Sequence, residues 1–547
     1  MLTTIASFIL LGAASTAVAA DVDDLEFSLE GYYRTRGYVF RNLTEDQEAP
    51  ARAMVQRLRL EPQVNFDDRA KFFFQTDVLD DVMWGDNASL ASTALFAGNP
   101  SATGMDGNEA DTFQVKRAWM EFDVPVGQLR VGRQPSNWGM GLLANDGNGF
   151  DDTFGENHRG STYDRIIFAT KPIAIAQTIL GRPDSGTPLY FAVGVDRLVE
   201  DPLIEYYGYT CTDGLVAGVD EDYDQRCDTD CDGITDVEHD FTDEDRTADQ
   251  RNDDWWLDQE DDVMEMIYVL IYKGQGLSLG GSAADLTAGV YVVNRTQVES
   301  NSDILISDAY LKFLWKGIYA EGEVLNIRGQ TDAIVLPGAY DPSSANAPLY
   351  KEANIWGYVG RLGMQNELMT AMFETGYASG DENVADVDFT GRAIHSDFNV
   401  GLLMYEEILA RVTSTVWTEN AEGLWSNGGV VNSRYIFPNI RYRPIKNWEF
   451  VAAYLRAWPH LPDGSRILCA DYDEKDGEPL NCAENKATAK HIGWETDFAV
   501  KHRFHEHVLF SMEAGYASMT DRVPLENVGL NPDGKFFTFQ SRIAYEF

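Results

Sequence analysis

Residues 537–547, FTFQSRIAYEF, alternate apolar and polar side chains over their whole length. The odd-numbered positions are mostly aromatic or aliphatic, and the even-numbered positions include Arg542 and Glu546. Because successive side chains of a β-strand point to opposite faces, this pattern predicts an extended strand with one apolar and one polar face. Such a strand needs an apolar environment on one side and water on the other.

The same alternation recurs along the chain. Residues 58–66 and 70–80 form one expected hairpin around the turn 67–69, which a soluble β-sandwich would also show. The number of such segments favours a barrel instead. The expected strands lie near 26–40, 54–66, 70–80, 113–124, 127–134, 163–170, 188–199, 262–273, 284–296, 303–316, 318–328, 354–365, 368–378, 431–443, 447–458, 489–502, 507–518 and 535–547.

Short and long connections alternate between these strands. The short ones include 67–69, 125–126, 315–317, 444–447 and 503–506, and the long ones are 81–112, 135–162, 200–261, 330–353, 379–430, 459–488 and 519–534. Only 171–187 is long where a short turn is expected. The predicted fold class is all-β: a transmembrane antiparallel β-barrel of about 18 strands (range ~16–20), with short periplasmic turns and long extracellular loops.

The distribution of apolar residues agrees with a barrel and with export. The mean hydropathy is −0.29, and no apolar run of about 18 residues, as a membrane helix requires, follows the first 20 residues. Residues 1–20 are apolar and uncharged, and Ala17-Val18-Ala19 fits a signal-peptide cleavage site near Ala19 or Ala20, although a basic residue is missing. We therefore expect a signal peptide at 1–20, a barrel at 21–547 and an acidic loop at 200–261 inserted within the barrel.

Several segments resemble known outer-membrane proteins. FTFQSRIAYEF resembles the C-terminal strand of outer-membrane β-barrels, which typically ends in an aromatic residue recognised by the barrel-assembly machinery. Residues 115–139 resemble a strand–turn–strand unit of Gram-negative porins, and residues 138–152 resemble uncharacterised outer-membrane proteins without assigned activity. The resemblance implies a place in the outer membrane of a Gram-negative bacterium, among lipid and lipopolysaccharide.

Residues 491–517 are similar to the penultimate hairpin of alginate-export-type outer-membrane channels. Glu495 and Asp497 match acidic positions of that hairpin. The resemblance implies an 18-stranded barrel with an Arg-rich lumen for an anionic polysaccharide.

The polar faces of the early strands carry an unusual number of arginines. The candidate pore-lining residues are Arg34, Arg36, Arg57, Arg59, Arg117, Glu121, Arg130 and Arg133. Arginines two residues apart point the same way, so adjacent strands would align them into a basic ladder that attracts anions. Acids on the same strands, such as Glu61 and Asp77, offer the alternative of internal ion pairs that only brace the wall.

The acidic loop contains a metal-binding pattern. Residues 201–262 hold 23 Asp and Glu against 3 Arg, a net charge of −20. Within them, DTDCDGITD at 228–236 resembles the calcium loops of thrombospondin type 3 and dockerin modules. The candidate Ca²⁺ ligands are Asp228, Asp230, Asp232, Asp236 and Glu238. His239 stands where an EF-hand has a bidentate Glu, and a solvated acidic loop is the alternative.

The five cysteines suit an oxidising compartment. Cys469 and Cys482 share one long loop and are candidates for a disulfide. Cys211, Cys227 and Cys231 lie in the acidic loop, where two of the three could pair, and a Cys₃ zinc site is the minor alternative.

Charge and motifs exclude other classes of function. A net charge of −45 argues against nucleic acid as a partner. The G-x-S-x-G string at 276–280 has strand-like sequence on both sides, whereas a nucleophile elbow needs a helix after it, so we expect no enzyme. A cluster of His502, His505 and His507 falls at an expected turn, which favours a neutral turn over a metal site.

The leading functional hypothesis is a porin: passive diffusion of small hydrophilic solutes, with anionic solutes as one option, or of polysaccharide through a charged constriction. Segments 135–162 and 398–425 are candidates to fold inward and narrow the lumen. The alternative is a non-conducting structural or adhesive surface barrel that acts through its calcium-binding loop. The sequence leaves the oligomeric state open.

Overall fold

The computed structural model describes residues 25–44, 50–66, 69–84, 114–150, 153–156, 160–198, 263–298, 301–331, 351–381, 387–414, 426–461, 491–520, 523, 525–526 and 529–547. The signal peptide and the whole acidic loop at 200–261 therefore lie outside the described residues, and both stay predictions.

Eighteen long strands form one antiparallel sheet that closes on itself, as the sequence predicted. They are β1 (Leu25–Arg41), β2 (Ala51–Phe66), β3 (Ala70–Trp84), β4 (Gln114–Val124), β5 (Gly127–Pro135), β6 (Thr162–Thr170), β7 (Leu189–Leu198), β8 (Met264–Leu279), β9 (Ser282–Gln297), β10 (Ser302–Trp315), β11 (Ile318–Thr331), β12 (Lys351–Gln365), β13 (Met369–Ala378), β15 (Ser433–Tyr442), β16 (Trp448–Pro459), β17 (Gly493–Phe504), β18 (Val508–Met519) and β19 (Lys535–Glu546). The short β14 (Asp388–Phe389) pairs in parallel with the start of β12.

The predicted last strand closes the barrel. β19 pairs with both β18 and β1, and Arg542 lies opposite Arg36 in the register. At the seam, the Gly31 N–H donates to the Phe547 carbonyl (3.1 Å), and the Phe547 N–H donates to the Gly31 carbonyl (3.0 Å). Closure satisfies the backbone groups that an open sheet would leave at its edges.

The outer face of the barrel is apolar. On β12, for example, the exposed residues Trp356, Tyr358 and Leu362 alternate with the buried residues Ile355 and Val359. A closed barrel with such an exterior is built to sit in a lipid bilayer. The chain is therefore an outer-membrane β-barrel. The G-x-S-x-G string ends β8 and is followed by strand β9, not by a helix.

Some aromatic side chains of the strands lie inside the barrel and not on its lipid-facing surface. Tyr32 packs edge-on against Phe150, and Trp119 stacks on Phe73. Trp448 at the start of β16 stacks on His502. His502 therefore makes a ring contact, and the described residues contain no cluster of three or more metal-ligating side chains.

The two ends of the barrel differ in the length of their connections. At one end, which we call the turn rim, β2–β3, β4–β5, β8–β9, β10–β11, β12–β13, β15–β16 and β17–β18 are joined by short turns. The exception is β6–β7, whose connection at 171–188 contains helix α2 (Pro172–Ile179). Most of the connections at the opposite end are long, which agrees with the predicted arrangement. No helix in the described part of the chain combines the length and the apolar composition that a membrane span requires.

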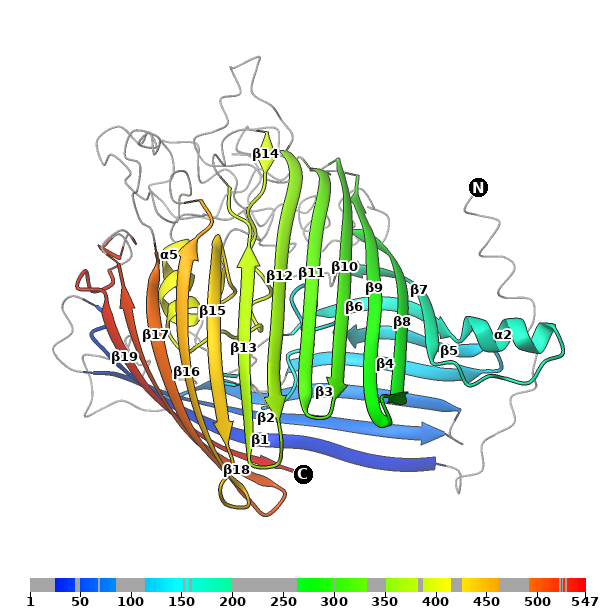
Figure 1. The fold of residues 1–547 in the computed structure, drawn as a ribbon, viewed down its shortest axis with the longest axis horizontal. Helices are drawn as coiled ribbons and strands as arrows, with labels where there is room; N and C mark the ends of the chain where they lie inside the picture. Colours follow the sequence, from blue (N-terminus) through cyan, green and yellow to red (C-terminus); the bar gives the residue numbers. More distant parts are fainter. Residues whose placement is uncertain are drawn as a thin grey trace, which may run out of the picture.

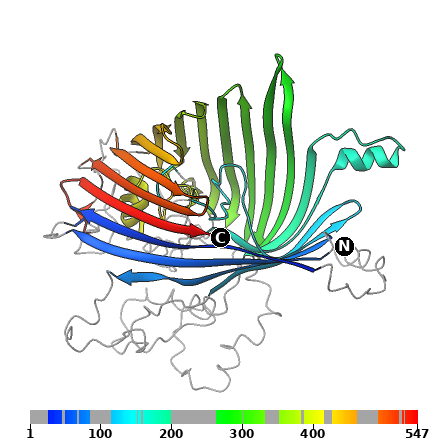
Figure 2. The same cartoon turned by 90° about the horizontal axis from the view of Figure 1, so that it is seen from below.

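Two segments fold into the barrel. We call the described residues within 136–161 (136–150, 153–156 and 160–161) the first inward segment and those within 387–432 (387–414 and 426–432) the second. The second contains the π-helix η5 (Met404–Leu409) and the helix α5 (Ala410–Ser414). Figures 1 and 2 both show α5 inside the curve of strands β15–β17. The prediction of inward-folding segments at 135–162 and 398–425 agrees with the structure for their described residues, and 415–425 lie outside these.

The hydrophobic core consequently lies inside the barrel. Residues 402–405 of the second inward segment are completely buried, together with wall residues of β15 and β16 such as Tyr435 and Leu455. A smaller cluster surrounds Trp138 of the first inward segment. The inner face of β15 and β16 is thus largely apolar, whereas the inner faces of the strands from β19 through β4 carry charges.

Candidate functional site

Most of the predicted pore-lining arginines lie together on the inner wall. Arg34 and Arg36 project from β1, Arg57 and Arg59 from β2, and Arg117 from β4, and all five are buried. The strand register places Arg34 opposite Arg57. It also adds a sixth arginine, Arg542 of β19, opposite Arg36. We call these six residues the basic wall.

Part of the basic wall is braced by wall carboxylates. Arg59 Nε lies 2.7 Å from Asp77 Oδ1, and Arg57 Nε lies 3.7 Å from Asp77 Oδ2. Lys116 Nζ is 3.1 Å from the same carboxylate. Three cations therefore share the single negative charge of Asp77, so this carboxylate neutralises only part of their positive charge.

The remaining candidates lie away from the basic wall. Arg130 on β5 forms an ion pair with Glu121 on β4 (2.7 Å), three residues from the turn that joins these strands. Arg133 differs from Arg130 by an odd number of positions and therefore lies on the other face of β5. There it pairs with Asp164 of β6 (2.8 Å). The ladder of inward-facing arginines does not include Arg133.

The first inward segment lies against the basic wall. Its Glu156 carboxylate contacts Arg34, and its Oε2 lies 3.5 Å from Arg36 Nη1 and 3.6 Å from Arg542 Nη1. Glu156 is only 2% exposed. Next to it, the Gly155 N–H donates to Glu513 of β18 (3.0 Å). The segment thus brings its own anion to three wall arginines.

The electrostatic environment of Glu156 favours its charged form. Burial by itself raises the pKa of a carboxyl, but the guanidiniums of Arg34, Arg542 and Arg36 outweigh this and lower the pKa of Glu156 to about 2. The carboxylate is therefore ionised at any physiological pH.

The rest of the first inward segment is held through its backbone and amides. Arg117 donates to the carbonyls of Asp146 (2.8 Å) and Ser161 (3.2 Å). Arg59 Nη1 donates to the Asn148 side chain (2.9 Å). The basic wall therefore uses much of its donor capacity to hold this segment.

Glu323 of β11 holds the beginning of the first inward segment. It accepts the N–H groups of Met140 and Leu142, the second at 3.2 Å. Beside it, Asp308 of β10 accepts the Trp138 indole N–H (2.9 Å). Glu323 and Asp308 are both buried in this position.

Glu495 of β17 holds the second inward segment in the same way. Its carboxylate accepts three consecutive backbone N–H groups, those of Leu402 (2.7 Å), Leu403 (2.8 Å) and Met404 (2.7 Å). These N–H groups belong to the first residue of η5, to its N-cap Leu403 and to the residue before it, and N–H groups at a helix start have no acceptor within the helix. Asp497, two positions further along β17, is also fully buried. Of the two acids noted in the penultimate hairpin, Glu495 thus anchors an internal helix.

The two inward segments also contact each other. The His395 N–H donates to the Leu142 carbonyl (2.9 Å), and the Gly160 N–H donates to Asp397 (2.6 Å). His395 Nδ1 accepts the Asp397 N–H (3.0 Å), while its Nε2 lies 3.0 Å from Ser161 Oγ. Burial lowers the pKa of His395, which agrees with a neutral ring in this position. The segments therefore form one connected plug-like structure.

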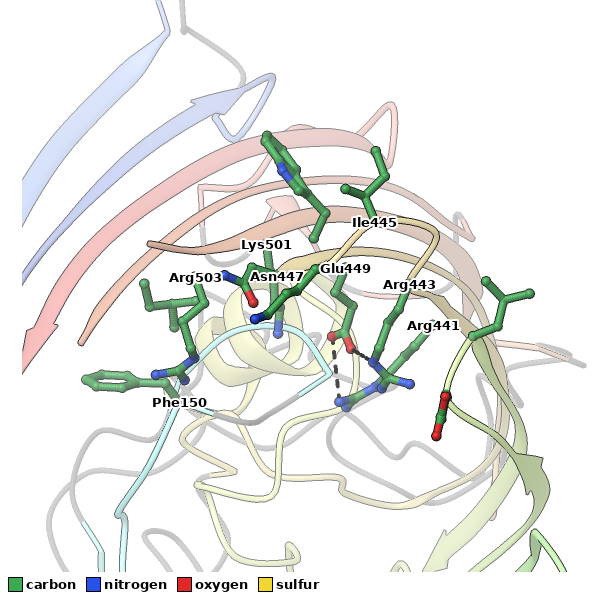
Figure 3. Close-up of a pocket in the computed structure, with 13 residues that line it drawn as sticks. Phe150, Arg441, Arg443, Ile445, Asn447, Glu449, Lys501 and Arg503 are labelled. Atoms are coloured by element: carbon green, nitrogen blue, oxygen red, sulfur yellow. Dashed lines mark hydrogen bonds and ion pairs between the residues drawn. The ribbon is translucent and has the colours of Figure 1, made fainter. Parts of the chain in front are cut away.

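Below this structure, toward the turn rim, the lumen contains a cavity of about 800 Å³. Figure 3 shows Arg441 and Arg443 of the β15 end facing Lys501 and Arg503 of β17 across it. Five basic side chains line the cavity against two carboxylates. The full lining is Phe150, Glu367, Leu368, Arg441, Arg443, Ile445, Lys446, Asn447, Trp448, Glu449, Lys501, Arg503 and Leu509. We call this cavity the basic vestibule.

Glu449 compensates part of this charge. Its carboxylate accepts Arg443 Nε (2.7 Å) and lies 3.9 Å from Arg441 Nη1, as the dashed lines in Figure 3 mark. Arg503 forms an ion pair with Glu546 of β19 (2.5 Å). The cations still outnumber the acids, so the vestibule has a positive character.

The sequence interpretation missed the residues that build this site. Glu156, Glu323 and Glu513 were not among its candidates, nor were Arg441 and Lys501. The acids at 323 and 513 and both basic residues stand at inward positions of alternating strands, so the same period-2 pattern could have identified them. Glu156 lies in an irregular segment, where no pattern indicates its partners.

Two predicted sites lie outside the described residues. These are the calcium ligands Asp228, Asp230, Asp232, Asp236 and Glu238, and the disulfide candidates Cys211, Cys227, Cys231, Cys469 and Cys482. Both sites stay predictions.

Comparison with known proteins gives structural likeness only. No protein-family model and no curated protein sequence matches this chain. Among solved structures, the chain is similar to Pseudomonas aeruginosa OpdQ, with 9% identity, coverage of 97% of this chain and 99% of that chain, and a TM-score of 0.47. It is also similar to P. aeruginosa OccK1 (OpdK), with 9% identity, 95% and 98% coverage and a TM-score of 0.45. P. aeruginosa OccK2 (OpdF) shows 9% identity, 96% and 98% coverage and a TM-score of 0.44.

Proposed function

We propose that this chain is an outer-membrane channel for the passive diffusion of small hydrophilic solutes, with a preference for anions. The observation that carries the proposal is the basic vestibule at the turn rim. Its volume of about 800 Å³ is in the range of small-molecule sites. Its excess of cationic side chains favours the entry of anions over cations.

The distribution of charge supports the anionic preference. The chain as a whole is strongly acidic, with a net charge of −45, yet the basic wall and the basic vestibule concentrate cations inside the barrel. A solute that carries carboxylates could form bidentate contacts with arginines such as Arg441. An anionic polysaccharide presents the same groups in a longer chain.

One observation favours a second candidate function. The two inward segments bury much of the inner wall, including five arginines of the sequence-predicted ladder. A barrel filled in this way would be a non-conducting structural or adhesive surface protein, acting through the calcium-binding loop around Asp228–Asp236. Conductance separates the two functions directly.

The experiment is single-channel recording of the purified, refolded protein in a planar bilayer, with a salt gradient to give the reversal potential. We expect discrete current steps with an anion-selective reversal potential. Arg441→Gln should shift this potential toward cation selectivity. The matched control is Arg434→Gln, on the same strand but on the exposed outer face, which should leave it unchanged.

Cation-selective steps would retain the channel but overturn its anionic preference. Protein that is folded, as judged by heat-modifiable mobility in detergent gels, yet never conducts would overturn the channel and support the structural barrel.

A further inference from the structure

The connection between β6 and β7 differs in chemistry from the other connections at the turn rim. Several of those turns carry charged residues, such as Lys316, Lys446 and Glu506. Residues 171–188 instead contain α2, whose sequence PIAIAQTI is almost entirely apolar. A segment of this composition at a rim that faces water needs a physical explanation.

The apolar side chains of α2 are not covered by the barrel. No residue of the helix is buried, and Ile179 and the following Leu180 are 78% and 66% exposed. Figures 1 and 2 both show α2 standing clear of the barrel wall at the ends of β6 and β7. The helix therefore does not form part of the barrel core.

The two polar side chains of α2 are satisfied within the connection itself. Thr178 Oγ1 donates to the Ala174 carbonyl (2.9 Å). Gln177 Oε1 accepts the Ser185 N–H (2.8 Å). The helix thus has little polar surface for water and presents mainly isoleucine, leucine and alanine to its surroundings.

The apolar surface of α2 adjoins the lipid-facing surface of the barrel. Ile166, on the outer face of β6 shortly before α2, is 56% exposed. In the neighbouring β4–β5 turn, Val126 is 54% exposed. An apolar surface therefore extends from the outer face of these strands onto the rim.

We propose that α2 lies in the periplasmic leaflet of the outer membrane, with its apolar side chains inserted at the boundary between phospholipid headgroups and acyl chains. Short apolar helices next to polar or basic residues bind at this depth. Arg182, exposed just after the helix, provides the cation that can reach a lipid phosphate. This contact would fix the height of the barrel in the bilayer on the β4–β7 side.

The size of the helix argues for lipid over a protein partner. Eight residues of helix span about 12 Å. A stable protein–protein interface buries roughly 800 Å² per partner, contributed by about 20–30 residues. α2 offers far less, whereas a lipid leaflet needs only a few apolar side chains, because the barrel already holds the helix at the membrane.

The test is site-specific photocrosslinking. The photoreactive amino acid p-benzoylphenylalanine replaces Ile179 in the full-length mature protein, which is reconstituted into vesicles of phosphatidylethanolamine and phosphatidylglycerol. Mass spectrometry then identifies the adducts. The same amino acid at Ile166 marks a lipid-facing position, and at Glu506 it marks a polar turn of the same rim.

We expect phospholipid adducts at position 179 at a yield within about twofold of that at position 166, and about tenfold above that at position 506. Absence of a lipid adduct at 179, when 166 gives one, overturns the proposal. A crosslink from 179 to a second copy of the chain would also overturn it and would identify a protein interface instead. Neither outcome depends on whether the barrel conducts.

Discussion

Glu156 is a carboxylate from an irregular segment that lies among three arginines of the barrel wall. Arg34, Arg36 and Arg542 come from two strands at opposite ends of the chain, which the closure of the barrel makes neighbours. A free anion in the lumen would meet the same donors. Glu156 therefore both holds the first inward segment and reduces the positive charge that a solute encounters.

Replacing this carboxylate should loosen the first inward segment. Glu156→Gln keeps the size of the side chain but leaves three buried guanidiniums without their shared anion. Removing one partner of a buried ion pair costs about 3–5 kcal/mol. We expect faster hydrogen exchange in residues 136–156 and a larger single-channel conductance. Glu506→Gln, the same change in an exposed turn, is the control, and equal exchange in the two variants would contradict the prediction.

The low pKa of Glu156 predicts a dependence on acid. Its pKa is about 2 in the folded protein, against an ordinary value of 4.5, so folding stabilises the charged form. The contribution of this group is therefore complete above about pH 4.5 and is lost progressively as the pH falls toward 2. We expect conductance changes to become more frequent as the pH falls from about 5 to about 3. Glu156→Gln cannot titrate, so a similar rise in that variant would assign the effect to other groups.

At the scale of elements, each inward segment is held by backbone N–H groups that donate to a wall glutamate. Glu323 serves the first segment and Glu495 the second, and an aspartate lies beside each of them. Carboxylates are strong acceptors for backbone N–H groups. At η5, whose N-cap Leu403 has no capping side chain, Glu495 of the barrel wall thus supplies the cap.

Removing the cap on η5 should release the second inward segment. Glu495→Ala leaves the buried N–H groups of Leu402, Leu403 and Met404 without their acceptor, at about 1–3 kcal/mol for each. We expect increased hydrogen exchange and protease cleavage within residues 401–414. Glu495→Gln retains one acceptor oxygen and should give an intermediate result. Thr496→Ala, the adjacent residue on the opposite face of β17, should behave like the unchanged protein.

At this scale the sequence predicted the strands better than the segments between them. Period 2 gave 26–40 for β1 and 507–518 for β18, within one residue of the observed Leu25–Arg41 and Val508–Met519. For the strand expected at 262–273, the same pattern stopped at residue 273, whereas the observed strand β8 continues to Leu279 past a bulge near Gly274. A bulge shifts the alternation, which hides the continuation from a pattern of fixed period.

At the scale of the whole molecule, the closure of the barrel depends on a close contact at the seam. A Cβ atom on Gly31 would lie 2.3 Å from the Arg59 carbonyl oxygen and 3.1 Å from the Phe547 ring. The seam is also where the two terminal strands exchange backbone hydrogen bonds. Closure of the sheet therefore depends on the absence of a side chain at Gly31.

Gly31→Ala should therefore impair closure. The backbone must shift to accommodate the methyl group, and overpacking of this kind typically costs about 1–3 kcal/mol. We expect a lower temperature for the loss of heat-modifiable mobility in detergent gels. Gly360→Ala on β12, where an added Cβ meets nothing within 4 Å, is the matched control. Equal transition temperatures for the two variants would contradict the prediction.

The sequence alone determined that this chain forms a barrel of 18 strands, because the alternation of side chains is a local property that each strand displays by itself. It also identified Arg34, Arg36, Arg57, Arg59 and Arg117 as residues of the inner face. The tertiary structure decided what these arginines contact. Arg542 lies beside Arg36 only because the first and last strands pair, and Glu156 reaches both only because an irregular segment turns into the lumen. Such contacts depend on closure and on long-range packing, which no pattern within a single segment encodes.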